Sequence, residues 1–80
     1  MPERKITPVH YEILIKIFEL DGFVVQRKKG DHIIMTKVGI KRPLVIKTSP
    51  RLVPVTHIRT NMTTAGMNRE RFFELLEKVK

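Results

Sequence analysis

The sequence predicts an α+β fold in two layers, a three-stranded antiparallel sheet with helices on one face. Three observations support this class: a helix-period apolar pattern opens the chain, three β-favouring runs separated by glycine turns follow, and two helix patterns close it. Strands in one run with helices only outside it are typical of α+β domains. Eighty residues are too few to split, so we expect one domain over residues 1–80.

The first helix is predicted to begin at Thr7 and Pro8. Threonine is a suitable N-cap, and proline suits the first helical position because the amide hydrogen it lacks has no partner there. Asp21 and Gly22 end the helix, since glycine tolerates the left-handed conformation that often follows a helix. The apolar stripe between these signals consists of Val9, Ile13, Ile17 and Leu20, widened by Leu14 and Phe18.

Three strands are predicted next, over residues 23–27, 32–37 and 43–47. A turn over residues 28–31 joins the first two strands into a hairpin, and Gly39 marks the turn before the third. The resulting order is helix, three strands, helix, helix.

The rest of the chain is predicted to be a loop over residues 48–54 followed by two helices. Two prolines disfavour regular structure in the loop. The first of these helices runs over about 55–65 and ends at Gly66 with Met67 as its apolar follower. Asn68 is the expected N-cap of the last helix, whose apolar face includes two phenylalanines.

Composition excludes several function classes. The chain has no cysteine, so disulfide frameworks, zinc fingers and thiol chemistry are excluded. His10, His32 and His57 lie far apart in sequence, and we therefore do not expect a three-histidine metal site. We also expect no other cofactor. No apolar run is long enough to span a membrane, and the N-terminal residues lack the apolar core of a signal peptide. These features predict a cytoplasmic protein without membrane contact.

Positive charge is concentrated in the middle of the chain. The net charge is +8, and residues 22–59 carry nine Lys or Arg side chains but one acid, Asp31. Such a surplus on one structural unit is typical of a polyanion site, because cations that neutralise phosphates release counterions. The charge therefore predicts RNA or DNA as a partner.

The candidate for chemistry is His32, which opens a strand just after a glycine turn and is preceded by three consecutive cations, Arg27, Lys28 and Lys29. Histidine exchanges a proton near neutral pH, and neighbouring lysines can hold a phosphate and stabilise its charge. This pairing suits attack of an RNA 2′-hydroxyl on the adjacent phosphate. An exposed strand histidine that only contacts phosphate is the alternative interpretation of the same residues.

Strand alternation places the predicted site on the open face of the sheet. Ile33 and Met35 are expected in the core, which leaves His32 on the other side. Along the third strand the same alternation leaves Val45 and Lys47 outside. The predicted RNA-binding residues, on or at the rim of the face with His32, are Lys28, Lys29, Gly30, Lys37, Lys41, Arg42 and Lys47. His10 and His57 are weaker candidates, the first at the surface and the second near a helix start.

The order of several short motifs resembles that of a known family. Five segments follow one another in the same order as in the HicA (YcfA-like) toxins of toxin–antitoxin pairs. They are Asp21-Gly22-Phe23, Arg27-x-x-Gly30-x-His32, Arg42-Pro43-Leu44-Val45-Ile46, Ala65-Gly66-Met67 and the Asn68-to-Leu76 segment. The resemblance covers about residues 7–79. The family usually has serine where Asp31 stands and often a second histidine where Ile33 stands.

This resemblance implies a fold like the double-stranded-RNA-binding domain and an mRNA interferase, an endoribonuclease that cleaves messenger RNA without ribosome or metal. It implies His32 as the catalytic residue and a HicB-like antitoxin as the protein partner. Two other functions remain open: a non-catalytic module that binds double-stranded RNA or DNA through the basic segment, and a domain that acts only through an acidic protein partner.

Overall fold

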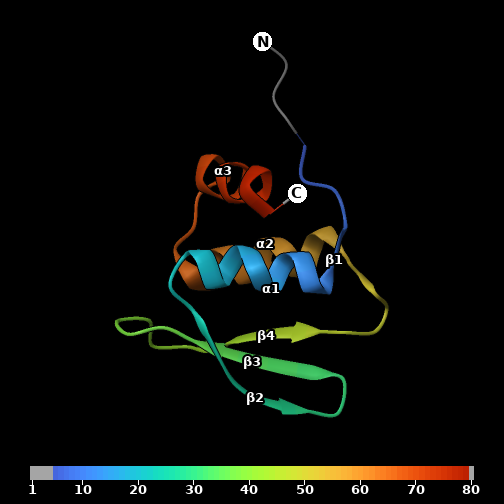
Figure 1. The fold of residues 1–80 in the computed structure, drawn as a ribbon, viewed down its shortest axis with the longest axis vertical. Coiled ribbons are helices and arrows are strands. Elements are labelled where there is room, and N and C mark those ends of the chain that lie inside the picture. Colours follow the sequence, from blue (N-terminus) through green and yellow to red (C-terminus); the bar gives the residue numbers. More distant parts are fainter. Residues whose placement is uncertain (1–4, 80) are drawn as a thin grey trace.

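The computed structural model describes residues 5–79 and confirms the predicted α+β class (Figure 1). Its central sheet is antiparallel, with strand order β2-β3-β4, and a separate two-stranded sheet pairs β1 with β5. Along the chain the elements are β1 (Val9–His10), α1 (Tyr11–Leu20), β2 (Val24–Lys29), β3 (His32–Thr36), β4 (Leu44–Lys47), β5 (Leu52–Val53), α2 (Val55–Ala65) and α3 (Arg69–Val79).

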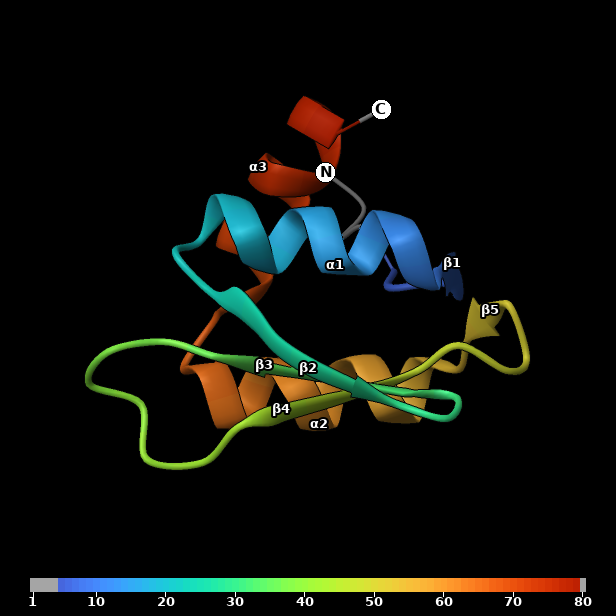
Figure 2. The same ribbon diagram turned by 60° about the horizontal axis from the view of Figure 1, so that its bottom comes forward.

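The helices lie toward the β4 side of the central sheet, and β2 forms its far edge (Figures 1 and 2). Both α1 and α2 contact β4, while α3 packs on α1. All six residues of β2 are exposed. The strand that carries three consecutive cations is therefore open to solvent.

The alternation of buried and exposed residues along β3 and β4 confirms the predicted polarity of the sheet. Ile33 and Met35 of β3 and Leu44 and Ile46 of β4 are buried. They meet apolar side chains of the helices in one core cluster, which includes Leu14, Ile17, Phe18, Ile58, Met62, Phe72 and Leu75. Since successive strand residues point to opposite faces, His32 and Lys47 lie on the face away from this core.

The predicted start of the first helix is wrong. Thr7 and Pro8 precede α1, and β1 intervenes, because Val9 and His10 pair with Val53 and Leu52 of β5. The helix is capped instead by His10, whose Nδ1 accepts a hydrogen bond of 3.2 Å from the backbone amide of Glu12. The predicted end is confirmed: Asp21 is the C-cap.

Two strand predictions also need correction. The first strand of the hairpin begins at Val24 and continues through Lys29, so the turn consists only of Gly30 and Asp31. The predicted loop over 48–54 contains β5, because Leu52 and Val53 find partners in β1 that only the tertiary fold brings near.

The ends of the last two helices confirm their predicted caps. Gly66 adopts the left-handed conformation with φ of 69°, and the amide of Met67 donates to the carbonyl of Met62 at 2.9 Å. The Asn68 side-chain oxygen accepts a 2.8 Å hydrogen bond from the amide of Arg71. Within α2, the hydroxyl of Thr60 donates to the carbonyl of Thr56, which satisfies a polar group in a threonine-rich helix.

Candidate nucleic-acid interface

His32 lies between two lysines in a row that crosses all three strands of the central sheet. Its Cα partners are Lys29 on β2 and Lys47 on β4. Residues directly opposite in an antiparallel sheet share a face, with Cβ atoms roughly 5 Å apart. Both lysines are exposed, and neither forms an ion pair with a carboxylate among residues 5–79. The row can therefore receive an anion directly over the histidine.

Asp31 lies beside the His32 ring. Its Oδ1 lies 3.2 Å from Nδ1 of His32, and the two side chains are 55% and 42% exposed, respectively. The two atoms are close enough for an ion pair when the ring is protonated, and Nε2, across the ring, is the nitrogen left to a bound substrate. The expectation that Asp31 lies at the turn is met, and its contact with His32 is an addition that alternation along a strand did not predict.

Thr48 fixes the turn against the end of β4. Its amide donates to the carbonyl of Asp31 at 2.8 Å, and its hydroxyl approaches the same oxygen at 3.3 Å. Gly30 turns the chain with φ of 59°, a backbone conformation that residues with a side chain rarely adopt. Together these residues hold the turn beside the histidine. Nothing in the sequence alone singles out Thr48 for this position.

A second row on the same face adds one more cation. Arg27 pairs with Ile34, which in turn pairs with Val45. Arg27 is exposed and, like the two lysines, has no carboxylate partner within the described part of the chain. We call Arg27, Lys29, His32 and Lys47 the His32 face.

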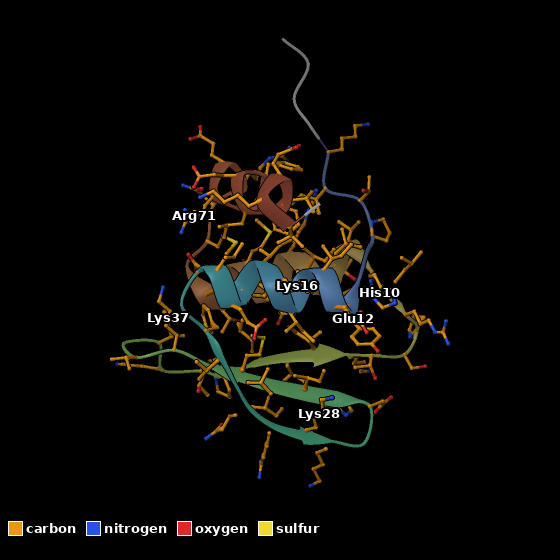
Figure 3. The ribbon with its side chains drawn as sticks, viewed as in Figure 1. His10, Glu12, Lys16, Lys28, Lys37 and Arg71 are labelled. Atoms are coloured by element: carbon orange, nitrogen blue, oxygen red, sulfur yellow. The ribbon has the colours of Figure 1, made fainter. Side chains whose placement is uncertain are left out.

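The expectation that Lys28 shares this face is wrong. Lys28 pairs with the buried Ile33, so its side chain leaves the strand on the side of the core (Figure 3). The error arises from the length of the hairpin. Because β2 continues to Lys29, Lys28 and Lys29 both lie in the strand, and their side chains point to opposite faces of the sheet. In the longer turn that the sequence predicted, this alternation would not apply to them.

Lys37 is also misplaced by the sequence prediction, because it serves a structural contact near the end of α1 (Figure 3). Its Nζ lies 3.7 Å from Oδ2 of Asp21 and 5.6 Å from the centre of the Phe23 ring. The same Asp21 carboxylate accepts a 3.3 Å hydrogen bond from Arg71 of α3. The pKa of Arg71 is raised above its ordinary value, mainly by the side-chain hydrogen bond to Asp21 and then by the one to Glu74. This cluster joins α3 to the C-cap of α1 and to the residue that follows β3, away from His32.

Lys41 and Arg42 are exposed in the segment between β3 and β4. They precede Pro43, at the opposite end of β4 from Lys47. Pro43 lies four positions before Lys47, roughly 13 Å along the extended chain. These two cations thus lie at the end of the sheet remote from His32.

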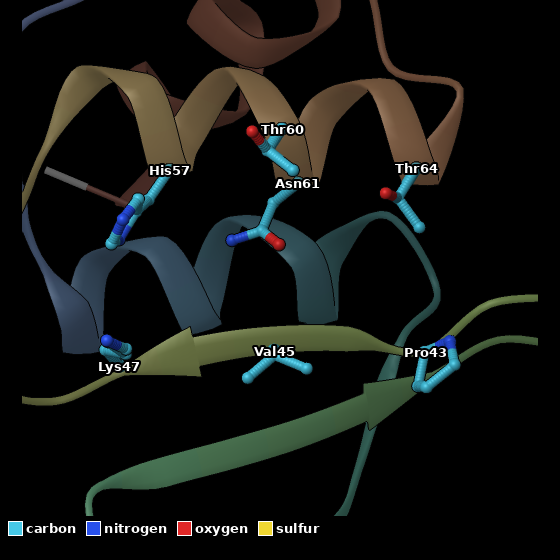
Figure 4. A pocket seen from close by; sticks show the side chains of 7 residues that line it. All are labelled: Pro43, Val45, Lys47, His57, Thr60, Asn61 and Thr64. Carbon is cyan, nitrogen blue, oxygen red and sulfur yellow. The ribbon is translucent and has the colours of Figure 1, made fainter.

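A hollow of about 280 Å³ lies beside the His32 face, between α2 and β4 (Figure 4). His57 and Asn61 project from α2 toward Lys47 and Val45 of β4. The structure therefore brings His57, a weak candidate from sequence, close to the predicted site. Asn61 was not predicted at all, although its position three residues after the apolar Ile58 places it beside the inner stripe of the helix.

A family model described as the HicA toxin of bacterial toxin–antitoxin systems matches residues 11–67, more than half of the chain. The chain belongs to the HicA toxin family. Comparisons with curated proteins and with solved structures gave no match. The part matched by the HicA model runs from the first residue of α1 to Met67 and contains the complete His32 face.

Membership in the HicA family makes this chain the toxin of a toxin–antitoxin pair and implies an antitoxin as its partner. Within residues 5–79, no helix combines the length and apolar character needed to cross a membrane. The same residues contain no group of three His, Asp or Glu side chains arranged to hold a metal ion.

Proposed function

We propose that this HicA toxin is an mRNA interferase that cleaves RNA on the His32 face. The observation that carries the proposal is the row Lys29–His32–Lys47, in which a histidine lies between two cations without carboxylate partners in the described chain. Family membership supports a toxic activity, and the charge supports a polyanionic substrate. The toxin would act in the cytoplasm, where messenger RNA is found.

In the proposed reaction, Nε2 of His32 accepts the proton of an RNA 2′-hydroxyl. The freed oxygen attacks the adjacent phosphorus, a new O2′–P bond forms, and the P–O5′ bond breaks. Lys29 and Lys47 stabilise the negative charge that develops on the phosphate oxygens. The departing O5′ takes a proton from water, which the exposure of the site allows. The products are a 2′,3′-cyclic phosphate and a 5′-hydroxyl, and no step requires a metal ion.

Asp31 is a positioning residue in this mechanism, and its effect on the ring can be measured. His10 provides a built-in comparison, because its Nδ1 accepts a hydrogen bond whereas Nδ1 of His32 faces a carboxylate. At alkaline pH, ¹⁵N spectra of the imidazoles should show the proton on Nε2 in His10 and on Nδ1 in His32.

Asp31→Asn should weaken the tautomer preference of His32, leave that of His10 unchanged and lower the rate of RNA cleavage. The mutation should leave the fold intact, since both side chains are substantially exposed. If His32 carries its neutral proton on Nε2 in the unaltered protein, Asp31 has no positioning role.

A HicB-like antitoxin is proposed to inhibit the toxin by covering the His32 face. The exposed cations there would attract an acidic surface of the partner, so RNA and antitoxin would compete for the same residues. Mutations in this face that weaken RNA binding are therefore also expected to weaken the complex.

The alternative function is a non-catalytic module that binds double-stranded RNA or DNA. It is favoured by the same cations, which can hold phosphates whether or not His32 reacts. The two functions separate when labelled RNA is incubated with the protein in EDTA. The toxin cuts the RNA, whereas the module retains it in a salt-sensitive complex without cutting it.

A further inference from the structure

The hollow between α2 and β4 continues the His32 face at the side of Lys47 (Figure 4). Lys47 belongs to both, since it pairs with His32 and lines the hollow together with His57. Two residues further back along β4, roughly 7 Å, Val45 contributes an apolar wall. One end of the hollow is thus cationic and adjoins the proposed reaction centre, while its middle is apolar.

Asn61 is the unusual feature of this hollow. The residue is only 6% exposed, and its side chain points from α2 toward Val45 (Figure 4). Among residues 5–79, no hydrogen bond to its amide group is found, and no fully enclosed side-chain nitrogen or oxygen lacks a partner. The amide must therefore reach solvent inside the hollow. The amide has no partner within the described protein and faces the open space of the hollow, where the polar edge of a bound ligand would be its partner.

The other side chains restrict what such a ligand can be. Pro43 and Val45 offer apolar surface for a flat ring, whereas the Asn61 amide offers one donor site and one acceptor site to its edge. The hydroxyl of Thr60 is already bonded within the helix, and the Asn61 amide is the polar group that points toward Val45. The volume is slightly below that of pockets for drug-sized ligands, which limits the occupant to about one ring system.

We propose that this hollow binds one unstacked RNA base next to the phosphate held by His32 and Lys47, and that Asn61 determines which base is accepted. The proposal rests on the proposed RNA cleavage and adds a sequence preference to it. Single-stranded RNA is read in this way in general, by placing splayed bases in pockets and pairing their edges with polar side chains.

The first experiment maps cleavage sites in a random-sequence RNA pool. The unaltered protein should prefer one base, or a subset of bases, at a single position beside the cut. Asn61→Asp presents two acceptors instead of a donor and an acceptor, and so should move the preference toward guanine, whose edge offers two donors. The preference should change at least about tenfold, because bases that match the new pattern gain on the order of 1.4 kcal/mol over others.

Thr63→Ala is the matched control, since Thr63 is an exposed residue of the same helix that lines a different hollow. Its cleavage pattern should equal that of the unaltered protein. An unchanged base preference in a folded Asn61→Asp variant overturns the subsite. Failure of the unaltered protein to cut RNA counts against the proposed function itself.

A second experiment avoids mutation of a buried residue. The chain has only three side-chain amides, those of Gln26, Asn61 and Asn68, and each gives its own pair of NMR signals. Addition of a short 2′-O-methyl RNA, which cannot be cut, should shift the Asn61 pair. The Asn68 pair should stay in place because that side chain caps α3. If the amides of Lys29, His32 and Lys47 shift while the Asn61 pair does not, the base subsite is wrong and the RNA site stands.

Discussion

Replacing His32 with alanine is expected to reduce RNA cleavage at least about 100-fold, the lower end of what a positioned acid or base contributes. The variant loses the only histidine that lies between two lysines in the central sheet. Its side chain is 42% exposed and outside the core cluster, so the fold should be retained. Initial rates on labelled RNA measure the loss, and relief of growth inhibition on induction measures it in cells.

His10→Asn is the matched histidine control for this experiment. Asparagine can still accept the hydrogen bond that caps α1, and His10 lies on β1 rather than in the central sheet. This variant should cleave RNA at the unaltered rate. A folded His32→Ala protein that cuts RNA as fast as its parent would show that His32 is not the catalytic residue.

The double variant Lys29→Ala/Lys47→Ala is expected to weaken RNA binding strongly and to make it less dependent on salt. Each lost phosphate contact with a single strand should lower the slope of log affinity against log salt by about 0.7, so the pair should lower it by about 1.4. Titrations of uncuttable RNA from low to moderate salt give this slope. Stability should change little, because exposed lysines contribute little to it.

The control for that variant is Lys16→Ala/Lys28→Ala, which removes the same charge from other surfaces. Lys16 is an exposed residue of α1, and Lys28 leaves β2 on the core side of the sheet (Figure 3). The salt slope of this control should stay close to that of the unaltered protein. Equal losses in the two double variants would mean that RNA responds to net charge and that the His32 face is not its site.

Local sequence signals predicted those parts of the fold whose causes are local. Alternation along residues 32–35 separated Ile33 and Met35 from His32, and Gly66 and Asn68 marked helix ends through their own backbone and side-chain chemistry. The prediction of where α1 starts was wrong because the cause of that start is not local. Pairing of Val9 with Val53 depends on residues far along the chain, which the local signal at Pro8 cannot include.

The candidate site was predicted in its centre and missed in its surroundings. The placement of His32, Lys29 and Lys47 on one face follows from strand alternation once the hairpin is placed. Lys28 was assigned to the wrong face because the predicted strand ended two residues before the observed end of β2. The environment of His32 could not be predicted from the sequence, since it depends on a turn geometry that brings the Asp31 carboxylate close to the histidine ring. Asn61 enters the site only because α2 lies along β4.

The chemical ends of the RNA fragments show which bond the toxin breaks and therefore decide between the possible cleavage reactions. Purified protein is incubated with a defined RNA in EDTA, and the fragments are analysed by mass spectrometry. Attack by a neighbouring 2′-hydroxyl on the His32 face predicts 2′,3′-cyclic phosphate and 5′-hydroxyl ends. Fragments with 5′-phosphate and 3′-hydroxyl ends, or RNA that is bound and left uncut, would contradict it.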